Sequence, residues 1–310
     1  MHTSKSANPT SINFPGFRNW FTAARPKTLV AAFVPVYTAS CLAAFAGFFR
    51  PGIALLCLLC AASLQIATNF INDASDFLRG ADTEERIGPM RMAQSGGISA
   101  KQLYTAGALM LALALAFGGY LIWTGGPIFL WLGAGAVVAA VAYTAGPYPL
   151  AYLGLGDFFV FVFFGLIAVV GGFFLQAGYV DRRAWLTACA IGLHAVSLIA
   201  INNVRDIPTD AKAGKRTLAV RLGNRLSRSY YAALLLVPYG IVLAGAVGEI
   251  LPRHAIFVLI TAPLALFLAK KALRVETGKG FIVLLERTAL HHLLFALLLG
   301  ASLLLGIHVL

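Results

Sequence analysis

The chain has 310 residues, of which 59 % are hydrophobic and only 12 % are charged, and its mean hydropathy is +0.82. Soluble domains have about 25 % charged residues and under about 50 % apolar ones. This composition excludes an ordinary soluble globular enzyme. Apolar runs of the roughly 20 residues that a helix needs to cross a bilayer recur from Thr28 to the C-terminus, so we expect a polytopic membrane protein.

Nine apolar stretches predict an all-α fold with nine transmembrane helices. An odd number of spans places the two ends of the chain on opposite sides of the membrane. We expect a cytoplasmic N-terminal segment, 1–27, and one transmembrane domain, 28–310, whose polar loops 71–102 and 204–229 carry the chemistry. The predicted spans are 28–49, 52–70, 103–123, 127–146, 158–178, 184–203, 230–248, 254–272 and 290–309.

The basic residues are distributed unevenly between the two sides. Of the 24 lysines and arginines, 20 lie in the segments on the N-terminal side of these spans. Short loops with this bias place that side in the cytoplasm. The net charge of +12 is therefore a topology signal of a protein in the cell membrane, and it does not indicate nucleic-acid binding.

The second predicted span ends in a group of amide and carboxylate side chains. Asn69, Asn72, Asp73 and Asp76 belong to this group, and the two aspartates are i, i+3 neighbours on one helix. Like charges at this spacing repel each other, and an intramembrane carboxylate costs roughly 3 kcal/mol. The group does not stabilise the fold and therefore indicates a functional site.

The sixth predicted span ends in the same way, with Asn202, Asp206 and Asp210 at i, i+4 and i+8. The two acidic groups are four spans apart, so both emerge on one face of the membrane, as an internal duplication would produce. A site made of oxygen ligands favours a hard cation, and Mg²⁺ usually shares its coordination with substrate phosphates. The two groups predict a divalent-metal site.

Basic residues follow each acidic group. A substrate that carries a diphosphate would be bound by metal on the aspartates and by these cations, which would stabilise the charge on the departing oxygen. The alternative is a set of solvated charges in cytoplasmic loops. The candidate bases are Arg79, Arg86 and Arg91 after the first group and Lys212, Lys215 and Arg216 after the second.

These residues resemble the two signatures of the UbiA superfamily of intramembrane prenyltransferases, N-D-x-x-D-x-x-x-D and D-x-x-x-D. Gly80 stands where the first signature has its third aspartate, and Asp82 is the nearest acid. The resemblance implies nine transmembrane helices around a central cavity, two Mg²⁺ ions and a long polyprenyl diphosphate whose tail leaves into lipid. It assigns the metal to Asn72, Asp73, Asp76, Asp206 and Asp210, with Asp82 as a further candidate, and the diphosphate to the six bases.

The chain is most similar to the branch of 1,4-dihydroxy-2-naphthoate polyprenyltransferases of menaquinone synthesis. The stretches that carry this resemblance are 24–29, 80–98, 143–157 and 205–223. The branch implies that a polyprenyl group passes from its diphosphate to 1,4-dihydroxy-2-naphthoate, with loss of CO₂ and without an obligate protein partner. Catalysis would depend on the four aspartates Asp73, Asp76, Asp206 and Asp210.

The acceptor is expected at the same face as the metal. Tyr143 and Tyr148 resemble the wall of an aromatic-acceptor site, although tyrosines also anchor helix ends at the membrane interface. Arg25 and Lys27 lie just before the first span and are candidates for binding the acceptor carboxylate.

Other functions remain as alternatives. Within the superfamily the acceptor could be 4-hydroxybenzoate, homogentisate, haem or a chlorophyll precursor. A cation transporter would also use intramembrane carboxylates, but near the midplane on broken helices. A CDP-alcohol phosphotransferase would need a D-x-x-D-G motif with a downstream G-x-x-x-D, which this sequence lacks.

Overall fold

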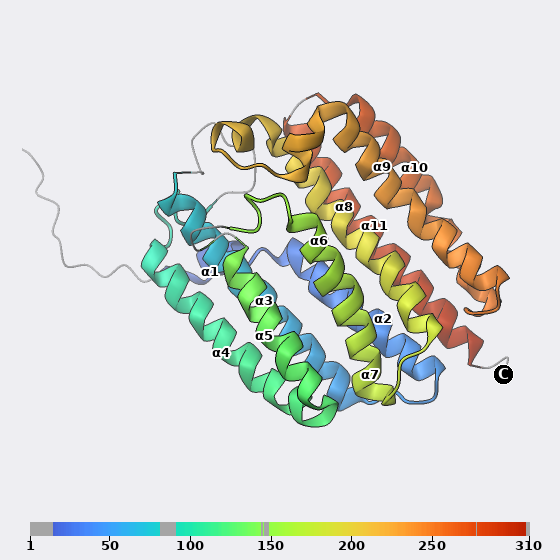
Figure 1. Cartoon of the computed structure of the whole chain (residues 1–310). Coiled ribbons are helices and arrows are strands. Elements are labelled where there is room, and N and C mark those ends of the chain that lie inside the picture. Colours follow the sequence, from blue (N-terminus) through green and yellow to red (C-terminus); the bar gives the residue numbers. More distant parts are fainter. Residues whose placement is uncertain (1–14, 81–90, 144, 146–148, 277, 308–310) are drawn as a thin grey trace, which may run out of the picture.

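The computed structural model describes residues 15–80, 91–143, 145, 149–276 and 278–307. Nine helical rods account for most of this part of the chain, and it contains no strand (Figure 1). The rods are α2 (Leu29–Phe45), α3 (Pro51–Leu78), α4 (Ala100–Gly125), α5 (Pro127–Ala142), α6 (Gly156–Val160) continued by the π-helical η2 (Phe161–Gly171) and α7 (Gly172–Ala177), α8 (Arg182–Lys212), α9 (Leu218–Val247), the 3₁₀ segment η3 (Arg253–Thr261) continued by α10 (Ala262–Arg274), and α11 (Gly278–Gly306).

The nine rods coincide with the nine predicted spans. Eight stretches are long and apolar enough to cross a membrane, and α5, with 16 residues, is a shorter apolar helix. The chain is thus an integral membrane protein with the expected all-α fold. The structure extends four rods well beyond the predicted spans. The helices α3, α8 and α9 continue into the segments that the sequence analysis treats as polar loops, and α11 begins at Gly278, before the predicted start at 290.

Local sequence signals set several helix starts. Pro51 and Pro127 occupy the first position of α3 and α5, where the missing N–H of proline costs no hydrogen bond. Ser99 and Gln102 form a capping box at the start of α4. The side chain of Thr217 accepts a hydrogen bond from the N–H of Val220 and caps α9.

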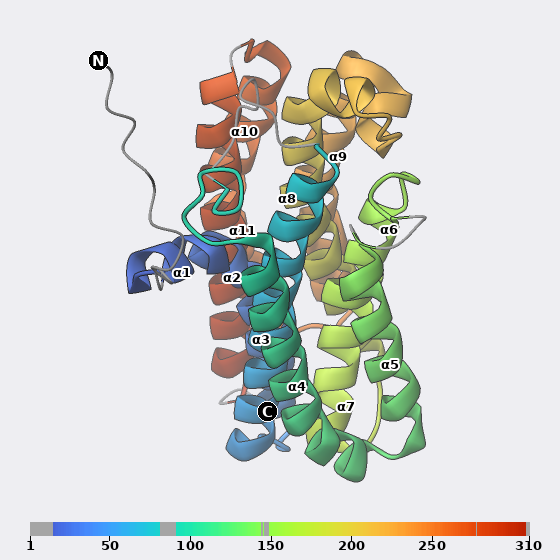
Figure 2. The ribbon, with the colours of Figure 1, turned by 90° about the vertical axis from the view of Figure 1, so that its left-hand side faces the viewer.

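A short amphipathic helix, α1 (Phe17–Ala24), precedes the first rod and lies across the bundle (Figure 2). The sequence analysis did not predict this helix. Its Trp20 ring contacts Phe70 of α3 edge-on, with 5.6 Å between the ring centroids. Its Asn19 side chain donates to the carbonyl of Gly97 at 3.1 Å. The helix is therefore attached to α3 and to the segment before α4, whereas Phe17 and Phe21 point outward and are exposed.

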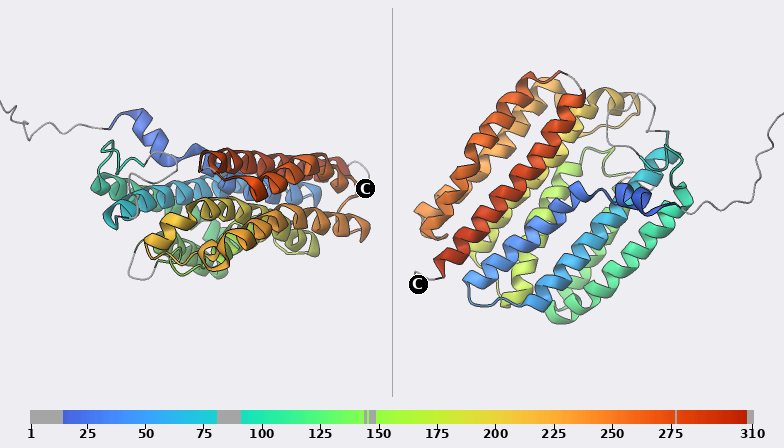
Figure 3. Two further views of the ribbon diagram at one scale, coloured as in Figure 1. Left: turned by 90° about the horizontal axis from the view of Figure 1, so that it is seen from above. Right: turned by 180° about the vertical axis from the view of Figure 1, so that it is seen from behind.

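Seen from behind, α10, α11, α2, α3 and α4 lie side by side, and the other rods cover their far side (Figure 3). The largest core cluster joins α2, α8, α9 and α11 and contains fully buried residues such as Leu42, Ile201, Leu235 and Leu299. The helix α2 contacts both α3 and α8, and it thereby joins these two helices in one bundle although they are far apart in sequence.

Close approach of η2 and α8 depends on two glycines. A Cβ atom added at Gly165 would lie 2.7 Å from the Cα of Gly192 and 2.9 Å from the carbonyl oxygen of Ala188. Small residues allow two helix backbones to approach in this way inside membranes.

We expect Gly165→Ala to destabilise the protein by about 1–3 kcal/mol, because the new methyl group would meet backbone atoms that can move only if the two helices separate. Gly119→Ala in α4 is the matched control, since nothing lies within 4 Å of a Cβ added there and alanine favours helix by about 1 kcal/mol. Thermal unfolding in detergent measures both changes. A Gly165→Ala variant as stable as Gly119→Ala would contradict this account of the contact.

Candidate active site

The last two turns of α3 bring the first acidic group into the protein interior. Asp73 is fully buried, and its two carboxylate oxygens accept hydrogen bonds from the backbone N–H groups of Met92 and Ala93 at 3.0 and 3.2 Å. This carboxylate thus fastens the segment before α4 to the end of α3. Each oxygen keeps a further lone pair, so the contacts do not exhaust the ability of Asp73 to bind a cation.

Asp76 lies one turn later and faces two cations. Its Oδ2 atom accepts from the Nη2 atom of Arg91 at 2.8 Å, and both side chains are at most 7 % exposed. Its Oδ1 atom is 3.5 Å from the Nζ atom of Lys215, which comes from the loop after α8. The first acidic group therefore reaches the bases that follow both groups.

Lys215 connects the two acidic groups. Its Nζ atom is 3.5 Å from Asp76 on α3 and 4.0 Å from Asp210 on α8. The structure thus brings together carboxylates from helix ends that are four spans apart in the sequence. The ammonium group of Lys215 thus lies between two carboxylates, and the same negative surroundings would attract a bound metal ion.

Asp206 has a close partner that the sequence analysis missed. The guanidinium of Arg205 binds both carboxylate oxygens, Nε to Oδ1 and Nη2 to Oδ2, each at 2.7 Å. Asn202 donates to the same carboxylate at 3.5 Å. The Arg205 side chain is only 1 % exposed, so this ion pair is buried. The sequence shows that Arg205 is next to Asp206, but the buried orientation of the Arg205 side chain depends on the packing of α8.

Two of the predicted bases lie close to one aromatic ring. The charged ends of Arg79 and Lys215 are 5.6 and 5.0 Å from the centre of the Tyr152 ring, within the range of cation–π attraction. Burial raises the pKa of Tyr152, and the charge of Lys215 opposes that rise. Tyr152 was not among the predicted site residues, yet it positions two of them.

The loop that carries Tyr152 is fastened to the start of α9. The backbone N–H of Arg216 donates to the carbonyl of Tyr152 at 3.0 Å, and the Arg221 side chain donates to the carbonyl of Leu153 at 2.7 Å. Gly154 has a φ of +72°, and a Cβ there would lie 2.7 Å from the carbonyl oxygen of Arg216. Only glycine suits both the left-handed backbone and this close approach.

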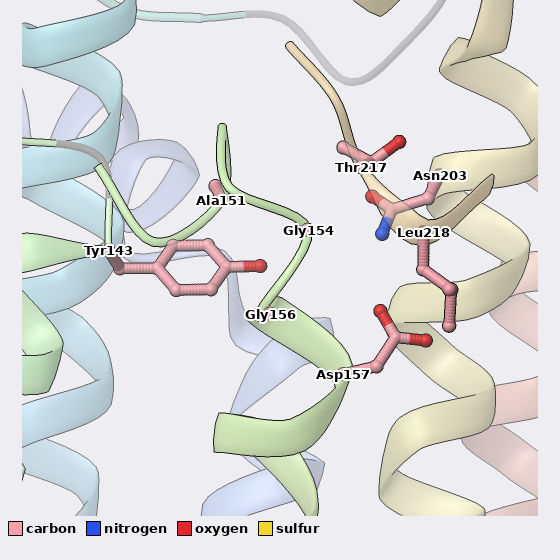
Figure 4. Close-up of a pocket in the computed structure, with 8 residues that line it drawn as sticks. All are labelled: Tyr143, Ala151, Gly154, Gly156, Asp157, Asn203, Thr217 and Leu218. Carbon is pink, nitrogen blue, oxygen red and sulfur yellow. The ribbon is translucent and has the colours of Figure 1, made fainter. Parts of the chain in front are cut away.

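A shallow pocket, whose roughly 200 Å³ of empty space includes open solvent, lies beside this loop (Figure 4). The hydroxyl of Tyr143, the amide of Asn203 and the carboxylate of Asp157 are directed toward the same space. Burial, followed by the charges of Asp157, Asp76 and Asp210, raises the pKa of Tyr143. Its hydroxyl therefore stays protonated near neutral pH and can donate a hydrogen bond beside the acidic groups.

The other predicted residues have varied surroundings. Lys27, 74 % exposed, pairs with Glu286 of α11 and makes no ion pair with the two acidic groups. Arg25 is half-buried between α1 and η1 (Pro26–Thr28). Lys212 and Arg216 are exposed near the second group. The remaining predictions, Asp82, Arg86 and Tyr148, lie outside the described residues.

The arrangement of oxygen ligands fits a metal that is shared with a substrate. Within the described ranges, no three acidic, histidine or cysteine side chains come close enough to hold a metal ion by themselves. Mg²⁺ is commonly held by one or two carboxylates together with water and phosphate oxygens, so it does not require such a cluster. The carboxylates of Asp76 on α3 and Asp210 on α8, which lie on either side of Lys215, are suitable ligands for Mg²⁺ bound in this way.

Comparison with known proteins agrees with this geometry. The UbiA prenyltransferase family matches residues 32–281. The chain belongs to the UbiA prenyltransferase family. The 1,4-dihydroxy-2-naphthoate octaprenyltransferase of Haemophilus influenzae is 43 % identical over 77 % of this chain and 85 % of that protein. The Escherichia coli protein of the same name is 37 % identical over 90 % of this chain and 94 % of its own length.

A solved structure shows the same fold. The UbiA homolog from Archaeoglobus fulgidus bound to GPP and Mg²⁺ superimposes with a TM-score of 0.61, covers 91 % of this chain and 99 % of its own, and is 18 % identical. The UbiA fold of this chain is thus shared with a protein that binds a prenyl diphosphate and magnesium.

Proposed function

We propose that this UbiA-family enzyme transfers a polyprenyl group from polyprenyl diphosphate to 1,4-dihydroxy-2-naphthoate, releasing diphosphate and CO₂ and giving demethylmenaquinol. The observation that carries the proposal is the meeting of the two signature acidic groups across Lys215 at one end of the bundle. The relatives with this activity in their names, which align over most of the chain, support the choice of acceptor.

The position of the carboxylates disfavours a cation transporter. Asp76 and Asp210 lie in the final turns of α3 and α8. Each of these helices runs without interruption from the other end of the bundle to the end that carries the acidic groups. Transporter sites form near the midplane, where helices are interrupted. Carboxylates at helix ends, mixed with bases, suit a phosphorylated substrate that approaches from the aqueous side.

Mg²⁺ would be held by Asn72, Asp73, Asp76, Asp206 and Asp210. When bound, it neutralises diphosphate charge and makes the diphosphate a better leaving group. Arg91 and Lys215, already beside Asp76, would bind the remaining phosphate oxygens, together with Arg79, whose guanidinium is 5.6 Å from the centre of the Tyr152 ring. These cations stabilise the charge that builds on the departing oxygen. On the sequence pattern we also include Lys212, Arg216 and Arg86 among the bases that bind the diphosphate, and Asp82 among the candidate metal ligands.

The chain then directs the allylic carbon to the acceptor. Departure of the diphosphate leaves a carbocation, which the electron-rich naphthoate ring attacks, and loss of CO₂ restores the aromatic ring. The apolar interior of the bundle excludes water that would capture the cation. The acceptor would bind near Tyr143, with Tyr148, Arg25 and Lys27 as further candidates from the sequence.

We further propose that the site faces the cytoplasm and that the protein resides in the cell membrane. Most lysines and arginines lie at the end of the bundle that carries the two acidic groups, which supports this orientation. Residues 1–27 would then be cytoplasmic and the rest would form one catalytic domain.

We expect Tyr143→Phe to raise the acceptor KM about three- to tenfold, because loss of one hydrogen bond costs about 0.5–1.5 kcal/mol. The ring and its packing stay, so the KM for prenyl diphosphate should change little. Steady-state kinetics with each substrate varied in turn provides the measurement. A rise confined to the diphosphate KM would move Tyr143 to the phosphate side of the site.

Membranes containing the enzyme, incubated with radiolabelled polyprenyl diphosphate and one acceptor at a time, test the proposed function. We expect prenylated product with 1,4-dihydroxy-2-naphthoate and none with 4-hydroxybenzoate or homogentisate. Membranes with the Asp76→Asn variant serve as the control. Product from one of the other acceptors, and none from the naphthoate, would reject the proposed substrate while keeping the prenyltransferase chemistry.

A further inference from the structure

Asp157 is a buried acid that the proposed chemistry leaves without a role. It lies in the first turn of α6 and is 8 % exposed. Within the described part of the chain, no lysine or arginine forms an ion pair with it, in contrast to Asp76, Asp206 and Asp210. A buried carboxylate without a cation is costly, so a contribution to stability does not explain its presence.

Asp157 has a hydrogen-bond partner on one side and an open pocket on the other. Its carboxylate hydrogen-bonds the hydroxyl of Tyr230 from α9. Its other side faces the pocket that Tyr143 and Asn203 line (Figure 4). Hydrogen bonds from Tyr230 and from the backbone N–H of Asp157 itself leave part of the acceptor capacity of the carboxylate unused. A ligand in the pocket would therefore meet a strong hydrogen-bond acceptor.

The pocket borders the two acidic groups. Asn203 directly precedes Val204 and the Arg205–Asp206 pair on α8, and Thr217 follows the loop that carries Lys215. The charges of Asp157 and Asp76 both act on Tyr143. A ring bound in this pocket would thus lie next to the place where the diphosphate is expected to leave.

A dihydroxynaphthoate suits this polarity in one orientation. Its 1-hydroxyl lies beside the 2-carboxylate and can bond to it, whereas the 4-hydroxyl is free to donate elsewhere. Asp157 would attract the 4-hydroxyl and repel the acceptor carboxylate. The ring would then be turned with its acid away from Asp157.

We propose that Asp157 is an acceptor-binding residue that accepts a hydrogen bond from the 4-hydroxyl of the naphthoate and sets the orientation of the ring. The inference rests on the proposed function and adds to it a residue that determines which aromatic acids bind. Tyr143 donates from the opposite wall of the same pocket.

The test compares two ligands in two variants. We expect Asp157→Leu, which keeps the branched shape with a somewhat larger volume but removes the oxygen acceptors, to raise the KM for 1,4-dihydroxy-2-naphthoate at least tenfold. The inhibition constant of 1-hydroxy-2-naphthoate, which lacks the 4-hydroxyl, should change less than twofold. Asp157→Asn keeps one weaker acceptor oxygen and should give a smaller rise, and it serves as the readable variant if the leucine variant fails to fold.

Tyr230→Phe is the matched control, since it removes the present partner of Asp157 and keeps the carboxylate. We expect less than a twofold change in acceptor KM. Three results would overturn the proposal. They are an equal loss of affinity for both ligands in the Asp157 variants, an unchanged KM for the naphthoate in those variants, and an equally raised KM in Tyr230→Phe. Wild-type enzyme that fails to prenylate the naphthoate rejects the proposed function itself, whereas active wild type with unaffected Asp157 variants rejects only this inference.

Discussion

Asp76→Asn is expected to lower prenyl transfer per folded protein by at least about 100-fold, and loss of the buried Asp76–Arg91 ion pair should also lower stability. Asp76 would act on the negative diphosphate through the metal that it holds and through Arg91 and Lys215, which it contacts. Loss of one preorganised electrostatic contact of this kind costs about 10²–10³ in rate. The amide keeps the size of the side chain but removes its charge as a metal ligand. Turnover in membranes, normalised to the amount of folded protein, measures the effect.

Metal removal should reproduce this loss. We expect EDTA to abolish turnover of the wild-type enzyme and added Mg²⁺ to restore it. Asp181→Asn is a suitable control, because Asp181 caps α8 at the opposite end of the bundle from Asp210. Full activity in EDTA, or near-normal turnover of Asp76→Asn, would refute the assignment of the acidic groups to a metal.

Arg205→Met is expected to destabilise the protein by about 3 kcal/mol or more. The guanidinium binds both oxygens of Asp206 and is almost inaccessible to solvent, so its removal leaves a carboxylate unpaired inside the protein. Breaking one half of a buried ion pair costs about 3–5 kcal/mol, mainly through this uncompensated charge. Thermal unfolding in detergent, without added metal, detects the change.

A double variant separates charge from packing. Arg205→Met combined with Asp206→Asn removes both charges, so we expect it to regain a large part of the lost stability while remaining inactive. Arg216→Met is the control, because Arg216 is exposed near the same helix end. If the double variant were as unstable as Arg205→Met alone, the loss would come from packing and the electrostatic explanation would be wrong.

The sequence by itself determined the spans and the two acidic groups. Hydropathy over about 20 residues decides whether a segment enters the membrane, since each transmembrane helix must satisfy its own backbone hydrogen bonds. The spacing of Asp73 and Asp76, and of Asp206 and Asp210, is likewise a local property of one helix. These features could be predicted because they depend on residues that are neighbours along the chain.

Only the tertiary structure decided which of these residues meet. It placed Lys215 between Asp76 and Asp210, put Tyr152 against two of the predicted bases, and turned Asp157 and Asn203 toward the pocket of Tyr143. It also attached α1 to the segment before α4 through Asn19. Such contacts depend on how α3, α6 and α8 pack together, and the sequence pattern of any one helix is compatible with many packings of its neighbours.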